Sequence, residues 1–98
     1  MKIKLSLREL EIVNDILDRY FPSVPIWVFG SRVSGESKPF SDLDLAIIST
    51  SPISFSILGK AKEAFIESDL PFSVDIVDWS TIPDTFQRKI KEQYYILR

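Results

Sequence analysis

The hydrophobic positions nearest the N-terminus repeat with the spacing of an amphipathic helix. Ser6 and Glu9 match the capping box, in which a serine hydroxyl and a glutamate side chain satisfy free N–H groups at a helix start. The pattern ends before Phe21-Pro22, and it therefore predicts a scaffold helix. Its apolar positions are Leu7, Leu10, Val13, Ile16, Leu17 and Tyr20.

Three short apolar runs are rich in aromatic and β-branched residues, and they predict strands. The second run ends in the continuous segment Ala46-Ile47-Ile48, which indicates burial on both faces. The three runs are Ile26–Phe29, about Asp42–Ile48, and Phe72–Trp79.

Two further segments repeat with helical period. One lies between a turn at Ser49–Pro52 and the pair Leu70-Pro71. The other begins at Pro83-Asp84, and its last turn would hold more apolar surface than one inward stripe needs. That surplus favours an oligomer or partner interface over core packing. The stripe of this last helix is expected to consist of Phe86, Ile90, Tyr94 and Leu97.

The order helix, strand, loop, strand, helix, strand, helix predicts an α/β (α+β) fold, in which a small mixed β-sheet packs with helices. The chain has 98 residues, enough for one core, so we expect a single domain over residues 1–98. There is no room for a separate substrate-recognition domain. Help from a partner chain, or from a second copy in a homo-oligomer, is therefore expected.

The amino-acid composition limits which catalytic and metal-binding groups the chain can use. The chain has no cysteine and no histidine, so thiolate nucleophiles and zinc sites built from these residues are excluded and carboxylates remain. A formal charge of −2 argues against direct nucleic-acid binding. No segment reaches the roughly 18 apolar residues of a transmembrane helix, and Met1–Leu5 lacks the apolar run of a signal peptide. We therefore expect a cytoplasmic protein that does not enter a membrane.

A Gly-Ser pair stands at the end of the first predicted strand. Gly30 lets the backbone turn and approach a ligand closely, and the hydroxyl and N–H groups of Ser31 can hold phosphate oxygens. Ser31 is also placed to open a short helix, and the polar segment Glu36–Phe40 that follows reads as a loop. An ordinary strand-to-helix turn would suit the same two residues.

Two aspartates begin the second predicted strand. Asp42 and Asp44 are two positions apart, so their carboxylates project from the same face and can converge on Mg²⁺, which prefers oxygen ligands. The alternative is a pair of exposed aspartates at a strand start. Ten residues separate Ser31 from Asp42, so the sequence places a Gly-Ser turn shortly before the two aspartates, and we favour the metal site.

A third carboxylate is expected from the last predicted strand. Asp75 lies between the apolar residues Val74 and Ile76, which makes a purely solvated role harder to explain. Asp78 is the rival candidate. Side chains alternate along a strand, so Asp75 and Asp78 point to opposite faces, and both cannot join the site unless the strand bulges.

The arrangement of Gly-Ser, ten residues and Asp-x-Asp with apolar flanks resembles the signature of the nucleotidyltransferase superfamily that includes DNA polymerase β. The short chain is similar to the minimal branch, the MNT proteins, which occur as antitoxins beside HEPN-domain toxins. The specific part of the resemblance covers Phe29 to Leu45. It implies the polymerase-β-like nucleotidyltransferase fold, with the first two strands antiparallel.

The resemblance also implies roles for the candidate residues. Gly30 and Ser31 would contact the β- and γ-phosphates of ATP or another nucleoside triphosphate. Asp42, Asp44 and Asp75 would bind one or two Mg²⁺ ions, and Asp75 would take the proton of the attacking hydroxyl. Two contacts stay open: Arg32 either adds a guanidinium contact to the phosphates or is solvated, and Ser41 either binds phosphate or caps the turn.

The reaction that this implies is attack of an acceptor hydroxyl on the α-phosphorus of the triphosphate, with pyrophosphate leaving. The donor would be ATP, and the acceptor would be a tyrosine of a HEPN-domain toxin that the antitoxin inactivates. A non-catalytic, nucleotide-binding antitoxin, which neutralises a toxin by complex formation, is the alternative. Transfer to RNA or to an antibiotic fits the chemistry but not the acidic charge.

Overall fold

The computed structural model describes residues 3–35, 38 and 40–98. Helix α1 spans Leu7–Tyr20 and has the predicted capping box between Ser6 and Glu9. Most of the predicted loop Glu36–Phe40 lies outside the described residues. No helix in the described ranges is long and apolar enough to cross a membrane.

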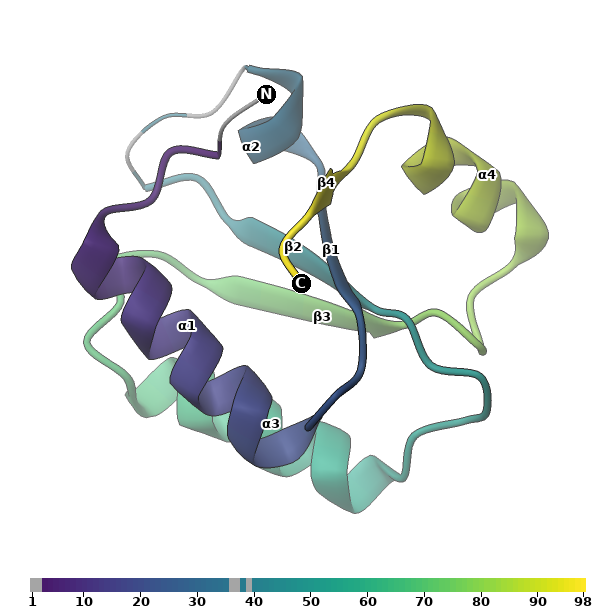
Figure 1. Cartoon of the computed structure of the whole chain (residues 1–98), viewed down its shortest axis with the longest axis horizontal. Coiled ribbons are helices and arrows are strands. Elements are labelled where there is room, and N and C mark those ends of the chain that lie inside the picture. The colour runs from purple at the N-terminus through teal and green to yellow at the C-terminus, as the bar shows by residue number, and fades with distance from the viewer. Residues whose placement is uncertain (1–2, 36–37, 39) are drawn as a thin grey trace.

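Four strands form one mixed sheet, in agreement with the predicted fold class (Figure 1). Their order is β3-β2-β1-β4, in which β1 is antiparallel to both of its neighbours and β2 is parallel to β3. The antiparallel pairing of the first two strands is the one that the resemblance implies. The strands are β1 (Ile26–Phe29), β2 (Leu43–Ile47), β3 (Val74–Asp78) and β4 (Tyr95–Ile96).

Helices lie on both sides of this sheet. Helix α3 (Phe55–Glu67) runs beside α1, and the two cover one face, whereas α4 (Asp84–Glu92) lies on the other side (Figure 1). A single turn of helix, α2 (Ser31–Ser34), directly follows the end of β1, as predicted for Ser31. The last residues of β1 and the first residues of β2 and β3 therefore meet at one end of the sheet.

The core lies between the sheet and the pair α1 and α3. Alternate residues of β2, which are Leu43, Leu45 and Ile47, are fully buried there against Val13 and Leu17 of α1. The residues between them point to the opposite face of the sheet. This alternation places Asp44 on the face that α1 and α3 do not cover. Ala46 is buried as well, as the continuous apolar run predicted.

The prediction for the C-terminal segment was wrong. Helix α4 ends at Glu92, and Tyr95–Ile96 form β4, which pairs with β1. The segment Tyr94–Leu97 consists of aromatic, β-branched and aliphatic residues that favour strands, and the free edge of β1 supplies backbone partners. Tyr94 stacks on Trp27, with ring centroids 4.2 Å apart. The last helical turn that favoured an interface therefore does not exist, although Ile96 of β4 remains 60% exposed.

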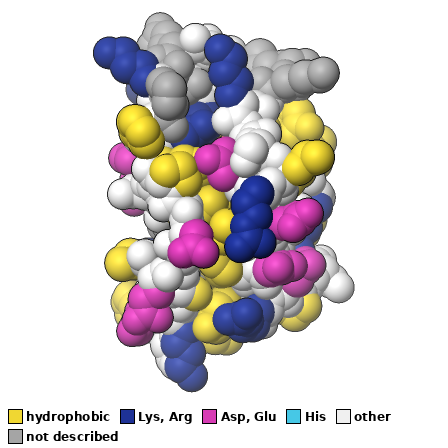
Figure 2. All heavy atoms as spheres, turned by 90° about the vertical axis from the view of Figure 1, so that its left-hand side faces the viewer, with side chains coloured by type: hydrophobic (Ala, Val, Ile, Leu, Met, Phe, Trp, Pro, Cys, Tyr) yellow, Lys and Arg dark blue, Asp and Glu magenta, His cyan; other side chains and the backbone are white. Residues whose placement is uncertain are grey.

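Charged side chains are mixed on the molecular surface. Figure 2 shows acidic and basic side chains interspersed with hydrophobic ones over the face at the left of Figure 1. Several large hydrophobic side chains are exposed, among them Phe55 at 94% and Ile66 at 82% on α3. Ile66 also lines a cavity whose wall contains Asp42 and Asp75.

Candidate active site

Asp44 lies at the centre of the candidate site. It is the Cα partner of Asp75 on the parallel strand β3 and of Phe29 on the antiparallel strand β1. Its side chain is half-buried, whereas Asp75 and Asp42, which directly precedes β2, are exposed. The pairing of β2 with β3 thus brings the predicted third carboxylate, Asp75, alongside the Asp-x-Asp pair.

Burial and neighbouring charges both affect the ionisation of Asp44. Burial raises the pKa of Asp44 to about 6, and the negative charges of Asp75 and Asp42 add to this rise. The two ion pairs within the described residues involve other carboxylates, those of Asp69 and Asp18. The three acids therefore concentrate negative charge at one end of the sheet without a protein cation that neutralises it.

Gly30 is required by its contact with Asp44. A Cβ atom at this position would lie 2.3 Å from Oδ2 of Asp44, far inside any van der Waals contact. The backbone φ angle of Gly30 is also +80°, a value that residues with a Cβ atom rarely adopt. The carboxylate of Asp44 therefore packs directly against the turn that leads into Ser31, and the two halves of the sequence motif meet in space.

Asp78 has a different environment from Asp75. It is 6% exposed, and it accepts hydrogen bonds from the Ser49 and Ser80 hydroxyls and from the backbone N–H groups of Ile53 and Ser80. Burial alone would raise the pKa of Asp78, but these hydrogen bonds lower it below its ordinary value. Asp78 is thus a structural carboxylate that holds two loops, and Asp75 alone faces Asp44.

Arg32 is a buried residue of the structure, with backbone partners on two other segments. This side chain is 4% exposed, and its guanidinium donates to the carbonyl oxygen of Ser41 at 3.1 and 2.8 Å and to that of Lys4 at 2.9 Å. It also lies 4.2 Å from the centre of the Phe72 ring. The guanidinium is buried, so Arg32 is not the solvated side chain of the alternative, and it positions the segment before Asp42.

Ser41 takes the second of its two predicted roles. Its hydroxyl accepts a hydrogen bond of 2.8 Å from the backbone N–H of Lys38, and its own N–H donates to the carbonyl oxygen of Lys38. Ser41 thus caps the turn before β2. Together with the contact from Arg32, this fixes the backbone on which Asp42 is mounted.

The donor set fits a magnesium ion. Within the described ranges, no three acidic side chains are close enough to form a closed ligand cage. Mg²⁺ does not need one, because it usually binds through one or two carboxylates together with phosphate oxygens and water. Asp42 and Asp44 supply two such carboxylates, and the raised pKa of Asp44 shows that a cation here would relieve an existing repulsion.

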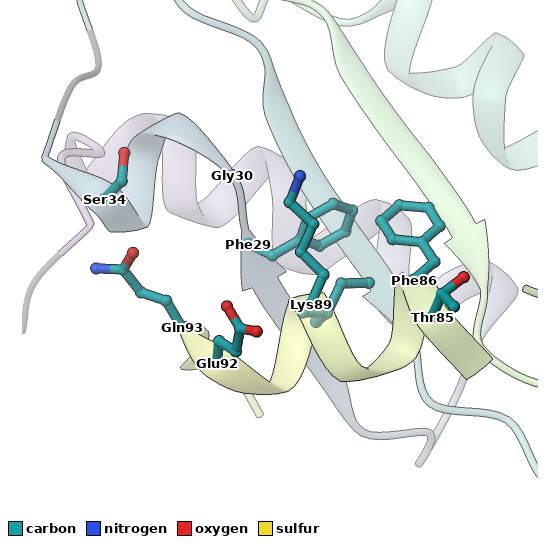
Figure 3. Close-up of a pocket in the computed structure, with 9 residues that line it drawn as sticks. Phe29, Gly30, Ser34, Thr85, Phe86, Lys89, Glu92 and Gln93 are labelled. Carbon is teal, nitrogen blue, oxygen red and sulfur yellow. The ribbon is translucent and has the colours of Figure 1, made fainter. Parts of the chain in front are cut away.

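A cavity that the sequence did not reveal opens next to this cluster. It has a volume of about 770 Å³ and lies between the end of β1 and helix α4 (Figure 3). Its walls include Gly30, Phe29, Phe86 and Lys89. In the sequence, Phe86 and Ile90 stand out only as members of a helical apolar stripe. Such a stripe is also typical of core packing, so it cannot reveal that a cavity remains between these residues and β1.

Comparisons with known proteins agree with this geometry. The sequence profile of the family described as Polymerase beta, Nucleotidyltransferase matches residues 11–97, nearly the whole chain. The chain therefore belongs to the polymerase-β nucleotidyltransferase family.

An individual relative indicates the branch of the family in which the chain falls. The chain is 44% identical over 97 residues to the "Probable protein adenylyltransferase MntA" of Haemophilus influenzae, and the match covers 99% of this chain and 85% of that protein. It thus falls among the minimal nucleotidyltransferases that the motif resembles.

Solved structures share the fold. A toxin–antitoxin crystal structure with AMP-PNP matches with a TM-score of 0.75 at 21% identity, covering 91% of this chain and 72% of that one. The toxin–antitoxin structure MntA-HepT matches with a TM-score of 0.67 at 19% identity, covering 91% of this chain and 68% of the other. At these identities the similarity concerns the fold.

Proposed function

We propose that this protein transfers AMP from ATP to the hydroxyl group of a tyrosine on a HEPN-domain toxin, and that it thereby acts as an antitoxin. Membership of the nucleotidyltransferase family and the 44% identity to a protein named as an adenylyltransferase support the reaction type. ATP as donor and tyrosine as acceptor follow the resemblance to MNT antitoxins.

One observation supports this proposal above all others. Asp44 is paired with Asp75 across β2 and β3, and its carboxylate packs against Gly30. Carboxylates and phosphate-binding turn are therefore adjacent in space, as transfer from a nucleoside triphosphate requires. The negative charges of Asp75 and Asp42 also contribute to the raised pKa of Asp44, after its burial, and a motif with a purely structural role would not need this clustering of acids.

Each residue has a defined task in the proposed reaction. Gly30 and Ser31 bind the β- and γ-phosphates and orient the triphosphate for in-line attack. Asp42 and Asp44 hold Mg²⁺, and Asp75 completes the site and accepts the proton of the attacking hydroxyl. When bound, Mg²⁺ supplies positive charge that stabilises the phosphate oxygens in the transition state. Arg32 and Ser41 act indirectly, because they fix the backbone before Asp42.

A labelling experiment tests the proposal. The protein is incubated with Mg²⁺, the HEPN-domain protein of its source organism, and ATP labelled on either the α- or the γ-phosphate. We expect label from the α-phosphate to appear on the HEPN protein and label from the γ-phosphate to stay in solution. The Asp42→Asn/Asp44→Asn variant should lose transfer by at least about 10²-fold, because it removes both proposed metal ligands.

A matched control removes two charges elsewhere. Glu11→Gln/Asp15→Asn neutralises two exposed acids on α1, on the other side of the sheet, and should leave transfer unchanged. Transfer that persists in the Asp42→Asn/Asp44→Asn variant would refute the proposal. If this variant loses transfer yet inhibits the toxin at full strength, the non-catalytic antitoxin is the correct reading.

A further inference from the structure

The cavity between β1 and α4 borders the candidate site directly. Gly30 forms part of its wall and also contacts the carboxylate of Asp44. Phe29, a second wall residue, is the Cα partner of Asp44. A nucleotide with its phosphates at Gly30 and the acids would therefore have its sugar and base within reach of this cavity.

The size and lining of the cavity suit a nucleoside. Its volume of about 770 Å³ falls within the roughly 300–1,000 Å³ of small-molecule sites. Phe29 and Phe86 make an edge-to-face pair with centroids 5.8 Å apart, and Figure 3 shows both rings in the cavity wall. Such rings offer an apolar platform on which a planar base can pack. Ile90 extends this apolar wall.

Polar groups line the rest of the cavity. Lys89 extends from α4 beside Phe29, and Gln93 faces Ser34 of α2 across the opening (Figure 3). The wall also holds Glu92, so the charged side chains of the lining are one lysine and one glutamate, and the Lys89 ammonium group can donate a hydrogen bond to an oxygen of the ligand. The Gln93 amide and the hydroxyls of Ser34 and Thr85 can hydrogen-bond to a base or a ribose.

A second cavity is less suitable for the donor nucleotide. It has a volume of about 650 Å³ and lies along the outer edge of β3, next to α3. Asp42 and Asp75 are both in its wall, and Gly30 is not. Gly30 is absent from its wall, so a nucleoside bound there would not lie next to the turn that is proposed to bind the phosphates.

We propose that the cavity between β1 and α4 binds the base and ribose of the donor nucleotide, with Phe29 and Phe86 as the apolar platform and Lys89 as an electrostatic contact. This inference rests on the proposed function, because it takes the phosphates to lie at Gly30 and Ser31. It assigns α4 to the active site and explains why this helix leaves a cavity above β1.

Calorimetric titration of the whole protein tests this assignment. MgATP and magnesium tripolyphosphate, which has no nucleoside, are titrated into the wild type and into Phe86→Ala. We expect Phe86→Ala to weaken MgATP about tenfold, the effect of losing one stacking ring, and to leave tripolyphosphate affinity unchanged. Equal MgATP affinities, or parallel losses for both ligands, would overturn the inference.

Two lysines of α4 provide a matched pair of variants. Lys89→Ala should weaken MgATP several-fold, because Lys89 lines the cavity. Lys91→Ala removes the same charge from the same helix, but its side chain lies over the Trp79 ring, 5.7 Å from the centroid, outside the cavity. Equal effects of the two substitutions would show that only the overall charge matters, and would contradict a contact from Lys89.

Amide chemical shifts give a measurement without any substitution, so that a poorly folded variant does not leave the inference open. MgATP should shift the amide signals of Phe29, Phe86 and Gln93, whereas tripolyphosphate should shift mainly those of Gly30 and Ser31. Absence of an ATP-specific shift on α4 would overturn the assignment. If ATP is transferred but α4 is unaffected, this inference fails alone, and if ATP binds along α4 without transfer, the proposed function fails alone.

Discussion

At the scale of single residues, Asp44 is held in an unfavourable environment by its strand. Its folded-state pKa of about 6 lies above the value of 3.8 for an ordinary aspartate, so the folded state binds this proton more tightly than the unfolded chain does. The resulting stabilisation is complete below pH 3.8 and is lost as the pH rises through 6. At neutral pH the charged form of Asp44 therefore costs stability, which its proposed metal-binding role explains.

Asp44→Asn should stabilise the magnesium-free protein at pH 8 but not at pH 4, because asparagine resembles the protonated acid and never ionises. We expect a gain of about 1 kcal/mol at pH 8, a value discounted because the side chain is partly exposed, or about 4–8 °C in Tm. Thermal unfolding in EDTA at both pH values measures it. A stability difference that does not change with pH would contradict this explanation.

The position of a residue in the site could be predicted from the sequence where it depends on neighbouring residues, and not where it depends on contacts with residues far away in the chain. Gly30, Asp42 and Asp44 follow from local spacing, because a turn at a strand end and alternation along a strand are properties of a few neighbouring residues. Arg32 could not be placed in this way. Its burial depends on the carbonyl group of Lys4, 28 positions away, and on the ring of Phe72. Nothing near Arg32 in the sequence indicates either contact.

At the scale of elements, the two aspartates of β3 differ in what they support. Asp78 accepts hydrogen bonds that fix the chain after β2 at Ser49 and Ile53 and the turn at Ser80. Asp78→Ala should therefore lower the free energy of unfolding by about 2–4 kcal/mol, since it leaves several buried donors without partners. Urea denaturation measures this change.

Asp75→Ala is the matched control on the same strand. Asp75 is exposed, and its charge raises the pKa of Asp44, so its removal should leave stability unchanged within about 0.5 kcal/mol or raise it slightly. Transfer activity should respond in the opposite order, with a large loss for Asp75→Ala and a small one for Asp78→Ala. Greater destabilisation by Asp75→Ala would reverse the structural assignment of the two residues.

Elements with a strong period or cap were predictable, and the last one was not. Helix α1 could be predicted from its capping box and its long apolar stripe. Strands β1, β2 and β3 could be predicted from their short apolar runs. The segment Tyr94–Leu97 continues the helical spacing of Phe86 and Ile90, so its period alone indicates a helix. What overrides it is the unpaired edge of β1, a partner almost 70 positions away in the sequence. Tertiary pairing decided between two conformations that the local pattern could not distinguish.

At the scale of the whole molecule, the two ends of β1 have separate tasks. The C-terminal end leads to Gly30 and the acids, whereas the N-terminal end is tied to the last residue of the chain. Arg98 donates to the carbonyl oxygen of Val24 at 3.1 Å, and it contacts the Phe21 carbonyl oxygen and the Asp18 carboxylate. Ile26 donates to the Arg98 carbonyl oxygen at 3.0 Å. Through its side chain and its backbone carbonyl group, Arg98 therefore joins the segment after β4 to the end of α1 and the start of β1.

Arg98→Ala should destabilise the fold by about 2 kcal/mol, because carbonyl groups at the end of α1 lose a charged donor. MgATP affinity at 20 °C should stay within about twofold of the wild type, since Gly30 lies at the opposite end of β1. Arg8→Ala is the control: its ion pair with Asp69 is exposed and 4.0 Å long, and its loss should cost less than about 0.5 kcal/mol. Urea unfolding and calorimetry measure the two effects. A loss of MgATP affinity as large as the loss of stability would show that both ends of β1 respond as one unit, and that the acidic site depends on the C-terminal strand for its geometry.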